Sequence, residues 1–345
     1  MFAKSFSGNI YSYAVSTAGE FKTQLSLEKD IPIEMLRLFS DEELKDDAIL
    51  QQEIVYNIFL VQEGDLREWV DRDQLLNSWF IPTLCSNPNA GHFLEQYPDH
   101  SHYNWEFLSA NPSAISLLEQ NLSRVDCYSL STNANAIRLL ELHPEKIDWE
   151  GLSSNPEAFY LLEKNLDMID WNDICINAHP GISDFLEKHL DKVNWEDLSA
   201  NPSAVKLLER YPENIDWFGI CLNPAAVHIV EKNIEKADFM MLSVNPKAVE
   251  LLEKHLDKVD WYGLSINSGA VELVSRYSDK IDWHSLSANP NAIELLKSYP
   301  ENIDWNMLSA NPGAIELLEQ NLEKIDYDQL ASNPAIFYPK CDKEL

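Results

Sequence analysis

Hydrophobic residues recur at one short interval through most of the chain. Each interval is marked by an aromatic residue that follows Asp or Asn, as at Trp149, Trp261 and Trp305, and successive marks usually lie 22 residues apart. With the mark as position zero, Leu or Ile stands at position three, Ala at nine, Ile or Val at ten, Leu at thirteen and Leu or Pro at seventeen. Positions nine, ten, thirteen and seventeen share one face of a helix, so the pattern predicts a helix with one buried side.

The same pattern predicts two helices in every unit. In residues 303–327 a helix of one or two turns is expected after Asp304, which caps it. A second helix of about ten residues is expected after Asn311, with Pro312 as its first residue. Strands are disfavoured because the repeat has no period-two alternation and places a Pro in nearly every unit.

About twelve such units occupy residues 81–338, the last of them truncated, and a tail covers residues 339–345. A fixed short period predicts an all-α fold, an α-solenoid in which each unit buries its apolar side against its neighbours. Because helices this short are marginal alone, the interfaces between units are expected to supply most of the stability. Helix layers about 8 to 10 Å apart would form a curved rod on the order of 100 Å long.

One unit departs from this period. Trp171 and Trp195 lie 24 residues apart, and the two extra residues are Ala178 and His179 in the turn between the two helices. We interpret the pair as a loop insertion that the fold tolerates. The alternative is that it alters the local curvature or marks a contact with a partner.

Residues 1–80 do not contain the repeat. Two alternating runs around Thr17–Gly19 predict a β-hairpin, and residues 31–70 have helical periodicity, with Ser40 and Glu43 as a capping box before a long helix. The segment is expected to cap the end of the stack or to recruit a partner. Its stretch "IPIEMLRLF" resembles the start of an F-box, although the later part of that pattern is missing.

Position six is Asn in every unit. Its side-chain oxygen is expected to accept the free backbone N–H groups at the start of the second helix, and also to tie one unit to the next. A ladder of ligand-binding amides is the alternative, but a ligand does not require one Asn per unit, whereas a cap does. We therefore interpret this column as structural caps: Asn87, Asn111, Asn133, Asn155, Asn177, Asn201, Asn223, Asn245, Asn267, Asn289, Asn311 and Asn333.

The aromatic residues at position zero have two interpretations. They could form a stacking platform for sugars or bases, or they could fill a packing site in the core. Cys127, Phe239 and Tyr327 replace Trp at this position, which favours core packing over a site that requires one kind of ring.

The chain is strongly acidic. Its 57 acidic and 26 basic residues give a formal net charge of −31, which opposes binding to nucleic acid or to an anionic membrane. No apolar run reaches the roughly 18 residues of a spanning helix, and the first residues lack the apolar core of a signal peptide, so a soluble intracellular protein is expected.

The acidic residues include a regular stripe at position fourteen. Basic residues at positions fifteen and nineteen are expected to neutralise part of it through weak ion pairs between neighbouring units. The stripe is interpreted either as a solvated face or as an acidic ridge that binds a partner with a basic surface. The candidate ridge residues are Glu119, Glu141, Glu163, Glu187, Glu209, Glu231 and Glu253.

The five cysteines and nine histidines form no recognisable chemical site. Cys85, Cys175 and Cys221 stand at position four in place of Ser, so we expect buried free thiols in a reducing compartment and no metal site. His143 and His189 share position sixteen with Tyr and Asn, which predicts a left-handed C-cap. Without a Ser-His-Asp order, a glycine-rich phosphate loop or an HExxH motif, the sequence predicts no catalytic residue, no cofactor and no enzyme activity.

The unit, written "LSANPxAIxLLExNxxKIDW", resembles the short tandem repeats of giant and large nucleocytoplasmic DNA viruses. The resemblance covers residues 81–338 and implies a scaffold or virion-structural role, with other capsid proteins as partners, in a virion or in the host cytoplasm. We therefore expect a non-enzymatic protein-binding scaffold, such as a minor capsid or assembly component. The alternative is an adaptor in which residues 1–80 recruit host machinery and the solenoid selects targets. The variable positions one, two, five, eight and eleven are expected to project outward and to determine specificity.

Overall fold

The protein comprises two compact units, of which one contains almost the whole repeat array. The computed structural model describes residues 2–5, 10–12, 21–25, 36–39, 55–60, 65–77, 79–98 and 100–338. The first unit comprises Met1–Arg72 together with Ala335–Leu345, and the second comprises Asp73–Pro334.

The second unit is an all-α repeat solenoid. After the short helix α2 (Arg72–Leu75), every repeat begins with a short helix, and these first helices are α3 (Ile81–Ser86), α5 (Trp105–Ala110), α7 (Cys127–Thr132), α9 (Trp149–Ser154), α11 (Asp173–Ile176), α13 (Trp195–Ala200), α15 (Trp217–Leu222), α17 (Phe239–Val244), α19 (Trp261–Ile266), α21 (Trp283–Ser287), α23 (Trp305–Ser309) and α25 (Tyr327–Ser332).

A second helix follows each first helix except α25, which is followed by a 3₁₀ turn at Pro334–Ile336, so the last repeat is truncated as predicted. The second helices are α4 (Gly91–Glu95), α6 (Ile115–Glu119), α8 (Ile137–Leu142), α10 (Phe159–Leu162), α12 (Ile182–Leu186), α14 (Val205–Arg210), α16 (Val227–Lys232), α18 (Val249–Glu253), α20 (Val271–Ser275), α22 (Ile293–Ser298) and α24 (Ile315–Glu319).

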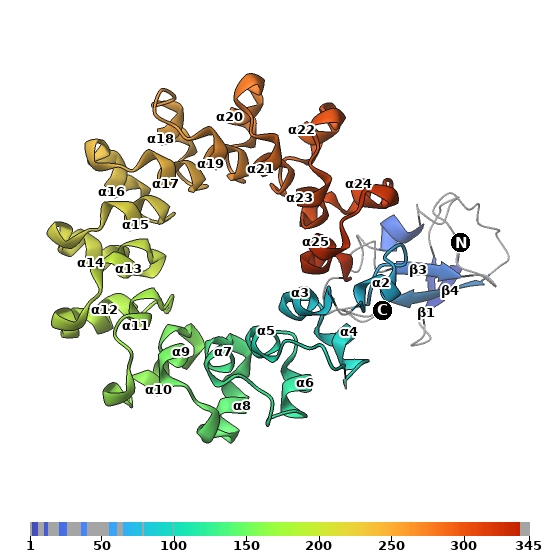
Figure 1. Cartoon of the computed structure of the whole chain (residues 1–345), viewed down its shortest axis with the longest axis horizontal. Coiled ribbons are helices and arrows are strands. Elements are labelled where there is room, and N and C mark those ends of the chain that lie inside the picture. The colour runs from blue at the N-terminus through green and yellow to red at the C-terminus, as the bar shows by residue number, and fades with distance from the viewer. Residues whose placement is uncertain are drawn as a thin grey trace. The chain divides into compact units, whose positions relative to one another are not determined.

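The second unit closes into a ring. Every first helix packs against the first helices of both neighbouring repeats, and α25 packs against α3 in the same way. In Figure 1 the first helices form the inner ring and the second helices lie outside it. The prediction of a curved rod is therefore wrong for this unit. The first and last repeats cover each other, so the ends that residues 1–80 were expected to cap are paired with one another.

The core of each repeat lies between its two helices. In the repeat of α17 and α18, Leu242 at position three, Ala248 at position nine and Leu252 at position thirteen are fully buried. The first helix begins at a side-chain cap, since the Asp238 carboxylate accepts from the N–H groups of Met240 and Met241. Equivalent Asp caps begin α7, α9 and α15, which confirms the predicted start of the first helix.

The second helix is shorter than predicted. The α-helix α14 covers Val205–Arg210, with a 3₁₀ turn at Pro202–Ala204 before it and another at Pro212–Asn214 after it. Ala204 has φ −98° and ψ 3°, outside α-helical geometry, so the segment from Pro to Ala cannot join the following α-helix in one regular element.

The backbone at position sixteen also differs from the prediction. Its φ is −129° at His143, −126° at Tyr211 and −134° at Asn233, so these residues are not left-handed. They still end their helices, and the Asn233 side chain donates from Nδ2 to the carbonyl of Ile229 at 2.9 Å. The residue at position sixteen therefore ends the helix with a negative φ. Where this residue is Asn, as at Asn233, its side chain also hydrogen-bonds to a carbonyl of the helix.

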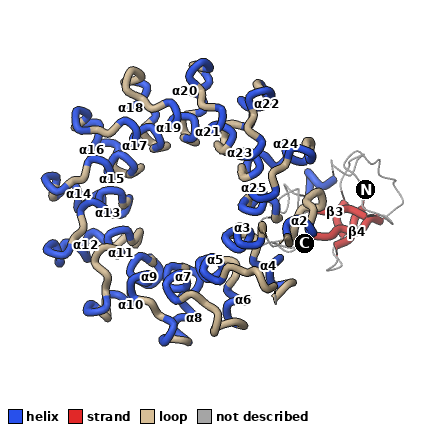
Figure 2. Tube along the Cα trace, in the orientation of Figure 1, coloured by secondary structure: helices blue, strands red, loops and turns tan. Residues whose placement is uncertain are grey.

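The first unit contains a four-stranded sheet, shown as strands in Figure 2. Its strands are β1 (Phe2–Ser5), β2 (Ile10–Ser12), β3 (Leu36–Phe39) and β4 (Val55–Leu60), in the order β2-β1-β4-β3. β1 pairs antiparallel with β2 and parallel with β4, while β3 pairs antiparallel with β4. Phe2 lies opposite Ser12 and Val55, and Leu36 lies opposite Leu60.

This sheet corrects the interpretation of residues 1–80. The helical prediction for residues 31–70 is wrong at β3 and β4, and the F-box-like stretch includes β3. The predicted hairpin is also wrong, because its second run is helical over residues 21–25 and the observed β1–β2 pairing lies earlier in the chain. Its turn at Thr17–Gly19 and the predicted capping box of Ser40 and Glu43 lie outside the described residues.

The segments on either side of the repeat array pair with each other inside the first unit. The N–H of Arg67 donates to the carbonyl of Ile336 at 2.9 Å, and that of Tyr338 donates to the carbonyl of Asp65 at 2.9 Å. The Arg67 guanidinium lies over the Tyr338 ring, 4.9 Å from its centre, and its Nε donates to the carbonyl of Ala335 at 2.7 Å. Residues 335–338, which the sequence placed within the solenoid, therefore belong to the first unit.

Candidate protein-binding surfaces

The asparagines at position six are buried and bond in two directions. Asn245 accepts the N–H of Lys247 at 3.0 Å through Oδ1, which caps the turn that follows. Its Nδ2 donates to the carbonyls of Cys221 at 2.9 Å and Asn223 at 3.2 Å in the preceding repeat. Each such Asn thus joins the start of its own second segment to the adjacent repeat. Equivalent contacts to both sides are made by Asn111, Asn155, Asn201, Asn289 and Asn311.

Ring closure uses the same contacts. Asn87 in the first repeat donates from Nδ2 to the carbonyls of Ala331 at 2.9 Å and Asn333 at 3.0 Å in the last repeat. Asn89 adds a bond from its Nδ2 to the carbonyl of Pro334 at 2.9 Å. The closing interface is therefore equivalent to the interfaces between consecutive repeats.

The residue at position four forms a second link between repeats. Ser109 donates from Oγ to the carbonyl of Trp105 at 2.6 Å and accepts the N–H of Asp126 at 3.0 Å. Cys175 makes the same two contacts through Sγ, at 3.2 Å and 3.3 Å. Burial raises the pKa of the Cys85 and Cys175 thiols to about 11, so both are structural and poorly reactive.

The aromatic residues at position zero are half-buried, not in the core. Trp217 lies under the Lys236 ammonium, which is 4.8 Å from the ring centre, and Trp305 lies under Lys324 at 4.3 Å. These lysines stand at position nineteen, where ion pairs with the acidic stripe were predicted. They lie instead over the aromatic ring of their own repeat, a cation–π arrangement that shields the ring from water.

The acidic ridge at position fourteen is partly neutralised by the next repeat. Six of its seven predicted members are exposed, and Glu187 is half-buried against Arg210. Glu231 binds Lys254 at 2.8 Å and Glu253 binds Arg276 at 2.8 Å, so the predicted pairing with position fifteen is confirmed at these places. Exposed pairs of this kind contribute little to stability, but they reduce the negative charge that the ridge offers to a partner.

The inner side of the ring is the face that the repeats leave uncovered. α15, α17 and α19 each contact the inner helices on both sides and their own outer helix. Residues at positions one and five lie on one face of a helix and are exposed on these three helices, except for half-buried Val244. Because these helices form the inner ring in Figure 1 and their other sides are in contact with neighbouring helices, we infer that this face points toward the inside of the ring.

This inner face contains a cluster of exposed apolar side chains, which we call the apolar arc. It consists of Phe218, Leu222, Met240, Tyr262 and Ile266 on three consecutive inner helices. Phe218, Met240 and Tyr262 are 53%, 60% and 57% exposed. Three adjacent repeats thus place large exposed apolar residues at the same positions, and contiguous exposed apolar patches are typical of interaction surfaces.

Acidic residues on and just before the preceding inner helices form a second group, which we call the acidic arc: Asp148, Glu150, Asp170, Asp173 and Asp197. Glu150 is exposed, and the other four are half-buried. Burial and then the charges of the other four raise the pKa of Asp173. Its Oδ2 has no hydrogen-bond partner within the described part of the chain. Asp173 also has the largest effect in raising the pKa of Tyr128, which shows that its negative potential extends to α7.

The variable positions behave differently from one another. Position one is exposed in all inner helices except α3, and position eleven is exposed on every outer helix from α4 to α24. Position two was also expected to project outward, but Ser129, Gly151, Gly219, Gly263 and Ser285 are buried there. The two arcs were not found from the sequence. The apolar residues at positions one and five of consecutive repeats could have revealed the apolar arc.

Other chemistry is not apparent in the described residues. His228 binds Glu209 at 2.9 Å and His284 binds Asp304 at 2.7 Å, both on the surface. No group of three or more His, Cys, Asp or Glu with metal-binding geometry occurs within the described ranges. No helix in those ranges is long and apolar enough to cross a membrane.

The comparisons with known proteins identify no relative. No protein-family model, curated protein or solved structure matches this chain. Its function must therefore be argued from its own surfaces.

Proposed function

We propose that this protein is a scaffold that binds a protein partner through the inner face of the ring formed by its second unit. The observation that supports this most strongly is the apolar arc of Phe218, Met240, Tyr262 and their neighbours. Exposed aromatic and Met side chains are the residue types enriched in protein interfaces.

The acidic arc defines the chemistry of the partner. Its members lie on or just before α9, α11 and α13, the inner helices that precede the apolar arc on α15, α17 and α19. A complementary segment of the partner would present apolar side chains to the apolar arc and Lys or Arg side chains to the acidic arc. Basic residues on the partner would relieve the repulsion that raises the pKa of Asp173, so electrostatic attraction would increase as the complex forms.

A designed amphipathic peptide of Leu and Lys tests this proposal. Its affinity for the full chain is measured by fluorescence anisotropy at low and high salt. The combined substitutions Phe218→Ser, Met240→Ser and Tyr262→Ser should weaken binding about ten-fold or more, as expected when central apolar contacts are lost. Salt should weaken binding to the wild-type ring, because the acidic arc contributes charge attraction.

A matched control removes exposed apolar residues elsewhere. Leu142, Met168 and Leu322 are also exposed but lie outside the apolar arc, and replacing all three with Ser should leave the affinity unchanged. Equal loss of affinity in both triple variants would show only nonspecific attraction to an acidic protein and would reject the inner face as the binding surface.

The biological setting of the scaffold rests on the resemblance to viral tandem repeats. We place the protein in a viral assembly, as a minor capsid or assembly component that holds another particle protein, in the virion or in the host cytoplasm. Quantitative mass spectrometry of purified particles tests this placement. A constant molar ratio to the major particle proteins is the expected result, and absence from washed particles would contradict it.

The alternative of a host adaptor has less support. It depended on helical, F-box-like residues at the start of the chain, and residues 36–39 form the strand β3 instead. The adaptor would be favoured over the scaffold if the full chain captured a ubiquitin-ligase subunit and if substitutions in the first unit abolished that capture.

A further inference from the structure

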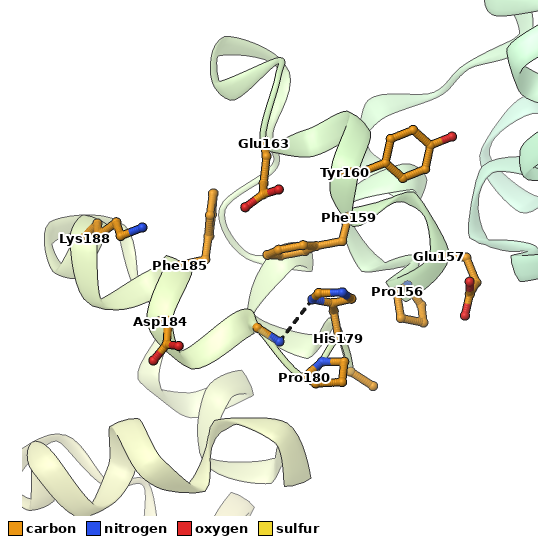
Figure 3. Close-up of a pocket in the computed structure, with 12 residues that line it drawn as sticks. Pro156, Glu157, Phe159, Tyr160, Glu163, His179, Pro180, Asp184, Phe185 and Lys188 are labelled. Atoms are coloured by element: carbon orange, nitrogen blue, oxygen red, sulfur yellow. Dashed lines mark hydrogen bonds between the residues drawn. The ribbon is translucent and has the colours of Figure 1, made fainter.

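The insertion of Ala178 and His179 opens a groove on the outer side of the ring. The groove has a volume of about 810 Å³, within the range of ligand-binding pockets. It lies between the outer helices α10 and α12, and the loop that contains the insertion forms one side. Figure 3 shows its lining residues.

Aromatic rings form the floor of this groove. His179 stacks on Phe159 with ring centres 4.0 Å apart and planes 13° from parallel. Phe185 meets Phe159 edge to face at 5.4 Å. The N–H of Gly181 donates to His179 Nδ1 at 3.1 Å, which fixes the orientation of the imidazole and places the proton of its neutral form on Nε2. The floor is thus held rigidly by contacts within the protein.

Three carboxylates surround these rings. Glu157, Glu163 and Asp184 line the groove, with Lys188 as the single cation among its lining residues. In Figure 3 the Glu163 carboxylate projects above the Phe159 ring and His179 lies below it. Phe159 and Phe185 are only 5% and 7% exposed, so half-buried His179 is the most accessible of the three rings. An accessible ring beside carboxylates favours a planar cation.

One carboxylate of the groove lacks the contact with the next repeat that most ridge residues make. The Glu at position fourteen bonds position fifteen of the next repeat in Glu187, Glu231 and Glu253, and position eleven of the next repeat in Glu141 and Glu209. Across the groove, no ion pair joins Glu163 to Lys188 in the described structure, and both residues line the open space. The carboxylate of Glu163 therefore borders the groove without such an ion pair.

We propose that this outer groove binds an arginine side chain presented by a partner polypeptide. The planar guanidinium suits the site because it can stack on the half-buried His179 imidazole and can donate to carboxylates on more than one side. A lysine ammonium can pair with Glu163 but cannot stack as a plane. The groove and the inner face are separate surfaces, so this proposal does not depend on the proposed function.

Short peptides test the groove directly. Affinities of acetyl-Gly-Arg-Gly amide and its Lys and citrulline counterparts for the full chain are measured by ligand-observed NMR titration. The Arg peptide should bind about five-fold more tightly than the Lys peptide, and citrulline, which has nearly the same shape without the charge, should bind weakest. Equal binding of the three peptides would overturn the proposal, and so would equal binding of the Arg and Lys peptides.

Two variants locate the binding. Glu163→Gln should weaken binding of the Arg peptide about five-fold, whereas Glu119→Gln, at the same repeat position outside the groove, should not change it. Deletion of Ala178 and His179 restores the 22-residue period and should abolish the preference for Arg, while the far-ultraviolet circular dichroism of the ring is retained. An equal effect of the two Glu substitutions, or a deletion variant that keeps the Arg preference, would overturn the proposal.

Discussion

The asparagines at position six stand at the ends of the inner helices, and the residues at position one lie on the same helices. The two columns differ in how much the residue varies between repeats and in how deeply it is buried. Position six is Asn in each repeat and is buried, whereas position one changes from Glu196 to Phe218, Met240 and His284 and is exposed. Asn245 makes three hydrogen bonds, two of them to the preceding repeat, whereas Met240 is 60% exposed in the same repeat. The comparison indicates that uniform positions build the ring and that exposed variable positions select what it binds.

The largest effect is expected from a change at position six. Asn245→Asp removes the Nδ2 donor and places a buried carboxylate beside the carbonyls of Cys221 and Asn223, which should destabilise the protein by roughly 4 kcal/mol. Asn245→Ala leaves the same carbonyls unpaired without the charge and should cost roughly 3 kcal/mol. Urea denaturation followed by circular dichroism measures both.

Met240→Ser is the matched control in the same repeat. Because Met240 is exposed, its loss should change the free energy of unfolding by less than about 0.5 kcal/mol. If Met240→Ser destabilised as much as Asn245→Ala, the division between building and binding positions would fail.

A smaller effect is expected where position six closes the ring. Asn87→Asp removes the donor to Ala331 and Asn333 in the last repeat, but the pairing of residues 65–68 with 335–338 still joins the two flanks. We expect Asn87→Asp combined with Arg67→Ala to open the ring and raise the radius of gyration measured by small-angle X-ray scattering. Arg67→Ala alone should leave the radius unchanged, since the contact between α3 and α25 remains. An unchanged radius in the double variant would show that ring closure does not depend on this Asn.

Local chemistry explains why the repeats were predictable. The Oδ1 caps of the position-six Asn residues and the Asp or Asn caps of most first helices involve N–H groups two or three residues away, so the sequence contains all the information. The Nδ2 bonds could not be predicted in detail, because their acceptors lie 22 and 24 residues earlier and are placed only by the stacking of repeats.

Closure and the first unit were harder to predict for different reasons. Closure follows from a small rotation added at every repeat, which no single repeat reveals. In the first unit, β3 and β4 are short apolar runs whose periodicity does not distinguish a strand from a buried helix. Aromatic and β-branched residues in Val55–Leu60 were the available signal for a strand.

The smallest effect is expected at half-buried Asp173 in the acidic arc. Its pKa is raised above the ordinary value of 3.8 by burial and by neighbouring acids, so the folded protein holds this proton more tightly than the unfolded chain. Ionised Asp173 therefore destabilises the fold at neutral pH. The penalty disappears as the pH falls below 3.8, where the group is protonated in both states.

Asp173→Asn should accordingly stabilise the ring at pH 7, and the gain over wild type should shrink toward zero as the pH is lowered to about 3. Thermal unfolding of both proteins across this range measures the difference. Glu106→Gln removes an exposed inner acid outside the acidic arc and should give no comparable gain at pH 7. If Asp173→Asn destabilised the ring at neutral pH, Asp173 would contribute to the stability of the ring, as the asparagines at position six do. A gain that vanishes at low pH would instead show that the charge of Asp173 costs stability, as expected of a residue that does not build the ring.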